Sequence, residues 1–155
     1  MNKDAFSKNV ELVKKLKPEW FLCTDGQIAT PQNISEIEKS INAKLPNEFT
    51  FFSLNYEAGY FGFLNIFSLS PDSEWYLPIK INEYPNTAPP SNFIAFSDDE
   101  TGGYYGFISK ESNYSNEVYH LDISTNELTP TNLNFFEFVI KTAFKPEHFN
   151  IPLPQ

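Results

Sequence analysis

The hydrophobic pattern of this chain changes period near Tyr60, and this change constrains the fold more than any other feature. Before Tyr60, apolar residues recur every three or four positions, as they do on one face of a helix. After it they recur every second position, which is typical of strands, and a helical pattern returns close to the C-terminus. Helices and strands are thus segregated along the chain, and this order predicts an α+β fold rather than alternating βαβ units.

Four helices are expected from the spacing of apolar residues. The expected helices cover residues 4–16, 34–44, 46–56 and 134–145. Pro18 ends the first helix and Pro146 ends the last, because proline lacks the N–H that a continuing helix requires.

The boundaries of the second and third helices carry their own signals. Two overlapping capping-box sequences begin at Asn33 and at Ser35, so either residue could start the second helix. Pro46 fits the first position of the third helix. Gly59 fits the left-handed residue that often follows a helix end.

Strand patterns fill the middle of the chain. The expected strands cover residues 60–67, 75–81, 92–97, 104–109, 117–123 and 127–129. The first is apolar on both faces, as in a buried strand, whereas Pro78 would keep the second at a sheet edge. Side chains of 117–123 should alternate between two faces. One face would hold Tyr119, Leu121 and Ile123, and the other Val118, His120 and Asp122.

One domain, residues 1–155, accounts for a chain of this length. A proline-rich loop is expected at 82–91, and no repeat or linker is evident. The N-terminus lacks the apolar core of a signal peptide, and no apolar run is long enough to span a bilayer. A single cysteine, Cys23, excludes an internal disulfide, and its apolar neighbours predict a buried thiol. A cytoplasmic location is therefore expected.

The charge distribution is uneven. The chain has 20 acidic side chains and 11 lysines, with no arginine, and five of the lysines lie in the first 17 residues. The remainder holds 18 acidic side chains against six lysines, a balance of −12. Such a body would repel nucleic acid and anionic membranes, so neither is expected as a partner. It would attract a basic protein, although an acidic surface can also serve solubility alone.

The segment FSDDETGGYYGF, residues 96–107, connects two of the expected strands. Its carboxylates are consecutive rather than alternate, so they should diverge and cannot form an EF-hand calcium loop. Its glycines do not match a phosphate-binding pattern, and the acids would repel phosphate. Two interpretations stay open. The segment is a tight turn in which Gly102 and Gly103 supply positive φ, or it is also an acidic patch for a protein partner.

Catalytic patterns are sparse, and no catalytic residue, metal ligand or cofactor is expected. A Cys23–His120 pair would be an isolated nucleophile and base, and His148 lies in a proline-flanked tail. The common hydrolase and metal motifs do not occur. Any two of the 20 acidic side chains could meet as a hydrolytic pair, but the spacing singles none out.

The run ISEIEKSINAKLPNEFTFFSLNYEAG, followed by NFIAFSDDETGGYYGFI and an aromatic helix, resembles the SUKH superfamily in its Smi/Knr branch. The resemblance covers roughly residues 30–145. The matching positions are Ile34, Ile37, Ile41, Leu45, Pro46, Phe49, Phe52, Asn55, Gly59, Phe93–Phe96, Asp98–Gly103, Tyr104–Ile108, Phe135, Phe136 and Phe138.

This resemblance implies an α+β domain whose mixed or antiparallel sheet is flanked by N-terminal helices and a C-terminal helix. It also implies a non-enzymatic role. Bacterial members are mostly immunity proteins that bind and block a cognate toxin, often a nuclease, and fungal members are signalling scaffolds. A toxin that holds nucleic acid is expected to be basic, and the acidic body described above would complement it.

A toxin-binding surface should combine exposed carboxylates with aromatic anchors. The candidate residues are Glu57, Tyr60, Trp75, Asp98, Asp99, Glu100 and Tyr104. We expect an immunity protein that uses this surface. An intracellular scaffold without a toxin partner is the main alternative, and a carboxylate hydrolase is a further one. For the oligomeric state, the sequence leaves a monomer and a weak dimer open.

Overall fold

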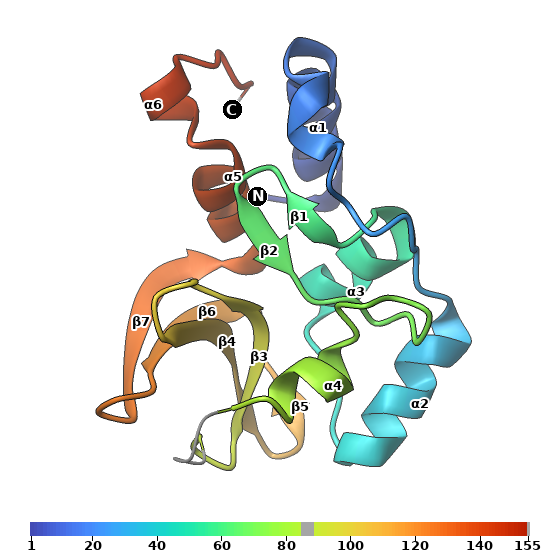
Figure 1. Cartoon of the computed structure of the whole chain (residues 1–155), viewed down its shortest axis with the longest axis vertical. Helices are drawn as coiled ribbons and strands as arrows, with labels where there is room; N and C mark the ends of the chain where they lie inside the picture. The colour runs from blue at the N-terminus through green and yellow to red at the C-terminus, as the bar shows by residue number, and fades with distance from the viewer. Residues whose placement is uncertain (85–88, 155) are drawn as a thin grey trace.

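The computed structural model describes residues 1–84 and 89–154, and it shows helices packed around antiparallel sheets (Figure 1). Residues 85–88 of the expected proline-rich loop lie outside the described residues. The helical elements are α1 (Lys3–Leu16), the 3-10 helix η1 (Pro18–Phe21), α2 (Pro31–Ile41), α3 (Asn47–Asn55), α4 (Leu77–Ile81), α5 (Phe135–Phe144) and α6 (Pro146–Phe149). The strands are β1 (Gly59–Phe61), β2 (Leu64–Ile66), β3 (Phe93–Asp98), β4 (Gly103–Lys110), β5 (Asn113–Tyr114), β6 (Glu117–Asp122) and β7 (Glu127–Asn134).

Two antiparallel sheets organise the strands. The larger one has the order β3-β4-β6-β7, with the short β5 also paired to β4, and the smaller one is the β1–β2 hairpin. The larger sheet lies beside α2, α3 and α4, while α1, α5 and α6 gather beyond one end of it (Figure 1). The α+β class predicted from the segregated pattern is confirmed, and the sheet is antiparallel throughout.

Helix α5 occupies the centre of the hydrophobic core. It contacts α1, α3, β2, β6 and β7, and it buries seven of its ten residues. Phe135 lies among rings from α3, β3 and β4, and Phe136 stacks on Phe6 of α1 with a centroid distance of 4.4 Å. One short helix thereby joins the N-terminal helix to the sheet.

Residues 60–67 form a hairpin rather than the single buried strand that was predicted. Phe61 pairs with Leu64, so Gly62 and Phe63 form a two-residue turn. Gly62 has φ +61°, and its N–H donates to Trp20 O, while the N–H of Phe63 donates to Ala143 O. The apolar pattern runs unbroken through this turn because the turn itself docks on η1 and α5.

Residues 75–81 were predicted as an edge strand, and this prediction is wrong. Leu77–Ile81 forms helix α4, with Pro78 in its first turn. Proline suits that position because the first turn has no intrahelical partner for its N–H groups. The β-branched residues Ile79 and Ile81 were misleading, since five residues are too few for a periodicity to decide between strand and helix.

The helix boundaries differ from those expected. Helix α2 begins at Pro31, because Thr30 and Asn33 form the capping box. Pro46 is the N-cap of α3 rather than its first helical residue, and Gly59 lies in β1 with φ +80° rather than at the end of α3. The predicted strand at 127–129 is the start of the longer β7. Helix α5 ends at Phe144, and Pro146 begins the short helix α6.

A bulge in β7, where four residue steps oppose two of β6, changes which side chains of β6 face the core. The pairing with β7 shifts register between Glu117 and Tyr119. Val118 and Leu121 are both fully buried as a result, although they are three residues apart. Val118 therefore does not share an outward face with His120, as strict alternation had predicted.

The hairpin tip should be sensitive to a single methyl group. A Cβ at Gly62 would lie 2.4 Å from the backbone oxygen of Ala143, whereas a Cβ at Gly102 would meet nothing within 4 Å. Both residues have positive φ, so both Gly→Ala variants carry backbone strain, and Gly62→Ala adds a steric overlap. We expect Gly62→Ala to lower the free energy of unfolding by about 1–3 kcal/mol more than Gly102→Ala. Urea unfolding of the two variants measures the difference, and equal losses would show that the tip is not tightly docked.

Candidate functional site

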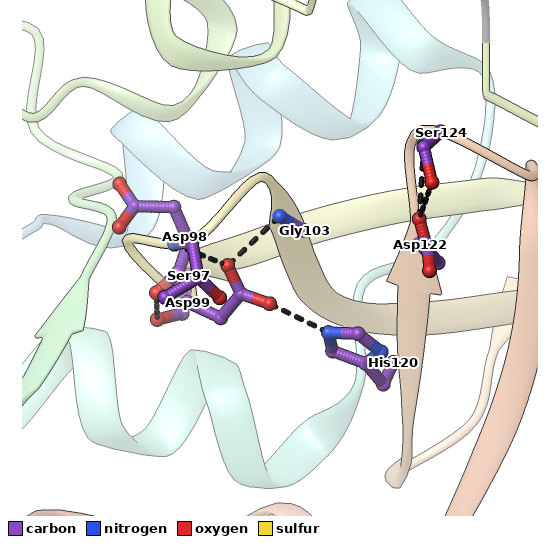
Figure 2. A network of polar contacts seen from close by, with 8 residues as sticks. Ser97, Asp98, Asp99, Gly103, His120, Asp122 and Ser124 are labelled. Atoms are coloured by element: carbon purple, nitrogen blue, oxygen red, sulfur yellow. Dashed lines mark hydrogen bonds and ion pairs between the residues drawn. The ribbon is translucent and has the colours of Figure 1, made fainter.

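The acidic turn joins β3 to β4. β3 ends at Asp98 and β4 begins at Gly103, so four residues, 99–102, make the connection. Asp98 pairs with Tyr104 across the two strands. The three consecutive carboxylates diverge, as expected. Asp98 accepts from Asn65, Asp99 contacts His120, and Glu100 accepts from Tyr60. Figure 2 shows the Asp98 and Asp99 carboxylates pointing in different directions.

Asp99 organises the turn itself. Its Oδ1 accepts from the backbone N–H groups of Thr101 and Gly103, each at 2.8 Å, and its Oδ2 lies 2.7 Å from Nε2 of His120 on β6 (Figure 2). Partial burial alone would raise the pKa of Asp99. The bonds from His120, Thr101 and Gly103 outweigh that effect and hold the pKa below its ordinary value. Asp99 therefore acts as a structural carboxylate.

The backbone of the turn uses two left-handed residues. Gly102 has φ +98°, as predicted, but the second is Glu100 with φ +60° rather than Gly103. Gly103 is required for a different reason. A Cβ there would lie 2.7 Å from Nε2 of His120 and 2.8 Å from the backbone oxygen of Leu121. The glycine lets β4 approach β6 closely enough for the Asp99–His120 contact.

Asp98 is a partly buried carboxylate without a cation beside it. Asn65 donates to its Oδ2 at 3.3 Å, and none of the ion pairs among the described residues includes Asp98. Burial, followed by the negative charge of Glu100, raises the pKa of Asp98. The fold thus holds one charge where neither water nor a counter-ion fully compensates it.

Tyr60 and Trp75 place aromatic surface next to these carboxylates. The Tyr60 hydroxyl donates to Glu100 at 2.6 Å, and the Tyr60 ring packs edge-on against Trp75 with a centroid distance of 5.6 Å. The hydrogen bond to Glu100, with smaller effects of burial and nearby charge, raises the pKa of Tyr60 to about 12. Nζ of Lys80 lies over the Trp75 ring, 4.5 Å from the ring centroid.

Five of the seven candidate residues form a single acidic face, namely Tyr60, Trp75, Asp98, Glu100 and Tyr104. Tyr104 belongs to it through its pairing with Asp98, and its ring packs on Tyr84 at 4.7 Å. Glu57 stands beside this face, where it accepts from Thr24 Oγ1 at 3.0 Å. Asp99 is the exception, because its carboxylate turns toward the sheet.

Three residues near the acidic face were not anticipated. Cys23 is exposed, so the predicted buried thiol is wrong, and its backbone oxygen accepts from Tyr60 N at 3.2 Å. Asp25 accepts a hydrogen bond from Ser73, and Lys80 covers Trp75. The contacts of Cys23 and Asp25 join residues 37 and 48 positions apart, whereas Lys80 is only five residues from Trp75. No local sequence pattern signals any of the three.

His120, the histidine considered as a possible base, is held by its neighbours. His120 contacts Asp99 and packs on Tyr105, with a centroid distance of 5.2 Å. No three metal-binding side chains converge within residues 1–84 and 89–154. In the same residues, none of the helices is both long and apolar enough to cross a membrane.

Adjacent aspartates should affect stability in opposite directions. A raised pKa means that the contribution of Asp98 is greatest at acid pH and is lost as the pH rises through the folded value, so ionised Asp98 destabilises the fold at neutral pH. Asp98→Asn should therefore raise the free energy of unfolding by about 0.5–1 kcal/mol at neutral pH. Urea unfolding measures the change.

Asp99→Asn should do the reverse. A lowered pKa means that the stability from Asp99 is present above its ordinary pKa of 3.8 and is lost as the pH falls through the folded value. Asp99→Asn should cost about 1–2 kcal/mol at neutral pH, and this loss should shrink in acid. Changes of the same sign in the two variants at neutral pH would contradict the assignment of roles.

Comparison with known proteins agrees with this architecture. The SUKH_6 family model, described as SMI1-KNR4 cell-wall, matches residues 31–139, which is more than half of the chain. The match includes α2, α3, both hairpin strands, the acidic turn and the start of α5. No curated protein matches the chain. The chain therefore belongs to the SUKH family, in its Smi1–Knr4 group.

Proposed function

We propose that this chain is a non-enzymatic immunity protein that binds a basic toxin through the acidic face and blocks it. The observation that carries the proposal is Asp98, a partly buried carboxylate that forms no ion pair with any described residue. A lysine or arginine from a partner would supply the missing charge and gain a charge-assisted hydrogen bond.

The aromatic side chains give this face the composition of a protein interface. Tyr and Trp anchor many interfaces, because they bury large areas with few rotatable bonds. Tyr60 and Trp75 already hold each other edge to face, and the Glu100 bond fixes the Tyr60 hydroxyl, so a partner would find them ordered. Preorganisation of this kind lowers the entropy lost on binding.

The overall charge supports a basic partner. A net charge of −9 attracts a cationic protein over the range of the Debye length and speeds its association. Family membership is compatible with toxin binding. The further expectation that the toxin is a nuclease rests on charge complementarity alone.

Neutralising the acidic face should slow binding to a candidate toxin encoded beside the gene of this chain. In the Asp98→Asn/Glu100→Gln variant we expect an association rate about tenfold lower and a weaker dependence on salt. The matched control is Glu111→Gln/Glu127→Gln, which removes the same charge from exposed positions elsewhere on the sheet. Stopped-flow mixing across a salt series measures both, and cell survival on co-expression reports protection.

If the two double variants slowed association equally, net charge alone would set the association rate and the acidic face would have no specific part in it. Trp75→Ala adds a second readout, because the loss of an anchor should raise the dissociation rate rather than slow association. An unchanged dissociation rate would remove Trp75 from the interface.

A scaffold of the Smi/Knr type is the second candidate, and the Smi1–Knr4 description of the matching family favours it. A chain of this type would have no toxin gene beside its own, and co-expression with neighbouring proteins would show no protection. If purified protein hydrolysed a substrate and lost that activity in the Asp98→Asn variant, both candidates would give way to a hydrolase.

A further inference from the structure

A second exposed surface is made of three aromatic rings from distant parts of the chain. Trp20 of η1, Phe63 of the hairpin tip and Phe149 of α6 contact one another, with centroid distances of 4.9 Å from Trp20 to each phenylalanine and 5.3 Å between the stacked phenylalanines. Phe63 is 47% exposed and Phe149 is 37% exposed. We call these three residues the aromatic cluster.

Backbone hydrogen bonds fix the aromatic cluster in this exposed position. Gly62 N donates to Trp20 O at 3.1 Å, and Phe63 N donates to Ala143 O at 2.8 Å. Phe149 N donates to Lys145 O at 3.1 Å. Large rings that are held rigidly and left in water are typical of interaction sites, whereas scattered exposed apolar residues are ordinary.

Lysines surround the aromatic cluster in a chain that is otherwise acidic. Lys17 Nζ lies 5.8 Å from the Trp20 ring, and Lys145 Nζ lies 5.5 Å from the Phe63 ring. Neither lysine forms an ion pair with any described residue. A hollow of about 320 Å³ adjoins Lys145. It is lined by Lys141, Lys145, Pro146, Glu147 and His148.

We propose that the aromatic cluster docks an acidic segment of a partner protein whose apolar side chains cover the rings. Lys17 and Lys145 would pair with carboxylates of this segment, and Lys141 lines the hollow beside them. The nearby acidic residues are Glu19 in η1 and Glu147 in α6. A second copy joined through the same surface would bring lysines against lysines. A flat anionic membrane would also lie against the acidic residues around this surface, whereas a short segment would contact the lysine-bearing surface alone.

This surface differs from the acidic face in charge and so selects a different partner chemistry. The β1–β2 hairpin contributes to both, since Tyr60 in β1 bonds Glu100, whereas Phe63 in the turn contacts Trp20 and Phe149. One molecule could therefore hold a basic protein and an acidic segment at the same time.

Trp20 fluorescence provides the test. The chain has two tryptophans, so the full-length Trp75→Phe variant leaves Trp20 as the reporter. The probes are short synthetic peptides in which Glu alternates with Leu or Phe, matched peptides with Lys in place of Glu, and phosphatidylserine–phosphatidylcholine vesicles. We expect a saturable blue shift with the Glu peptides only. No saturable shift, an equal response to Lys peptides, or a response to vesicles alone would overturn the proposal.

Two variants in the same background identify the surface. Phe63→Ala should weaken peptide binding at least about tenfold, whereas Ile79→Ala, which truncates an apolar side chain that is 55% exposed on α4, should not. Lys17→Gln/Lys145→Gln keeps the rings and should weaken binding and its salt dependence, unlike the control Lys8→Gln/Lys110→Gln. Binding that survives both test variants would place the peptide elsewhere and overturn the proposal.

Discussion

Burial of the aromatic face of α5 against both layers is the interaction on which this structure depends. The Phe135 ring lies 5.5 Å from Phe49 in α3 and 5.1 Å from Phe96 in β3, and Phe136 stacks on Phe6. Each fully buried phenylalanine contributes roughly 1.5–3 kcal/mol of transfer free energy. Because these rings meet in one place, the helical layer and the sheet are fixed together, and the β1–β2 hairpin docks on the end of α5 through Phe63.

The sequence predicted the fold class and most elements because periodicity reports burial directly. It failed where a tertiary contact overrode the local pattern. The apolar pattern did not indicate the turn at Gly62, because the turn residue Phe63 is itself apolar and continues the pattern. Phe63 is partly exposed and contacts other aromatic rings. Helix α4 was hidden because Pro78 fits both an edge strand and a first helical turn. The bulge in β7 was not indicated by the pattern of β6, since it arises from the pairing of the two strands.

The acidic face was predictable in part. Residue type and loop position were enough to bring Tyr60, Trp75 and Glu100 into one set, and the structure places them in contact. Residue type and loop position do not reveal which way a side chain points. The contact of Asp99 with His120 could therefore not be predicted from the sequence. Lys80 on Trp75 was missed for a related reason, because the contact requires the helical geometry of α4 that the pattern did not indicate.

Within the acidic turn, the carboxylate that holds the fold is a different residue from the two carboxylates of the proposed interface. Asp99 ties the loop to β6, while Asp98 and Glu100 accept side-chain hydrogen bonds from Asn65 and Tyr60 on the hairpin. Replacing the outer two carboxylates leaves the anchoring bonds of the middle one intact. Positions 98 and 100 can therefore be substituted to suit a partner of different charge while the fold of the loop is kept. These two positions are suitable for engineering altered binding selectivity.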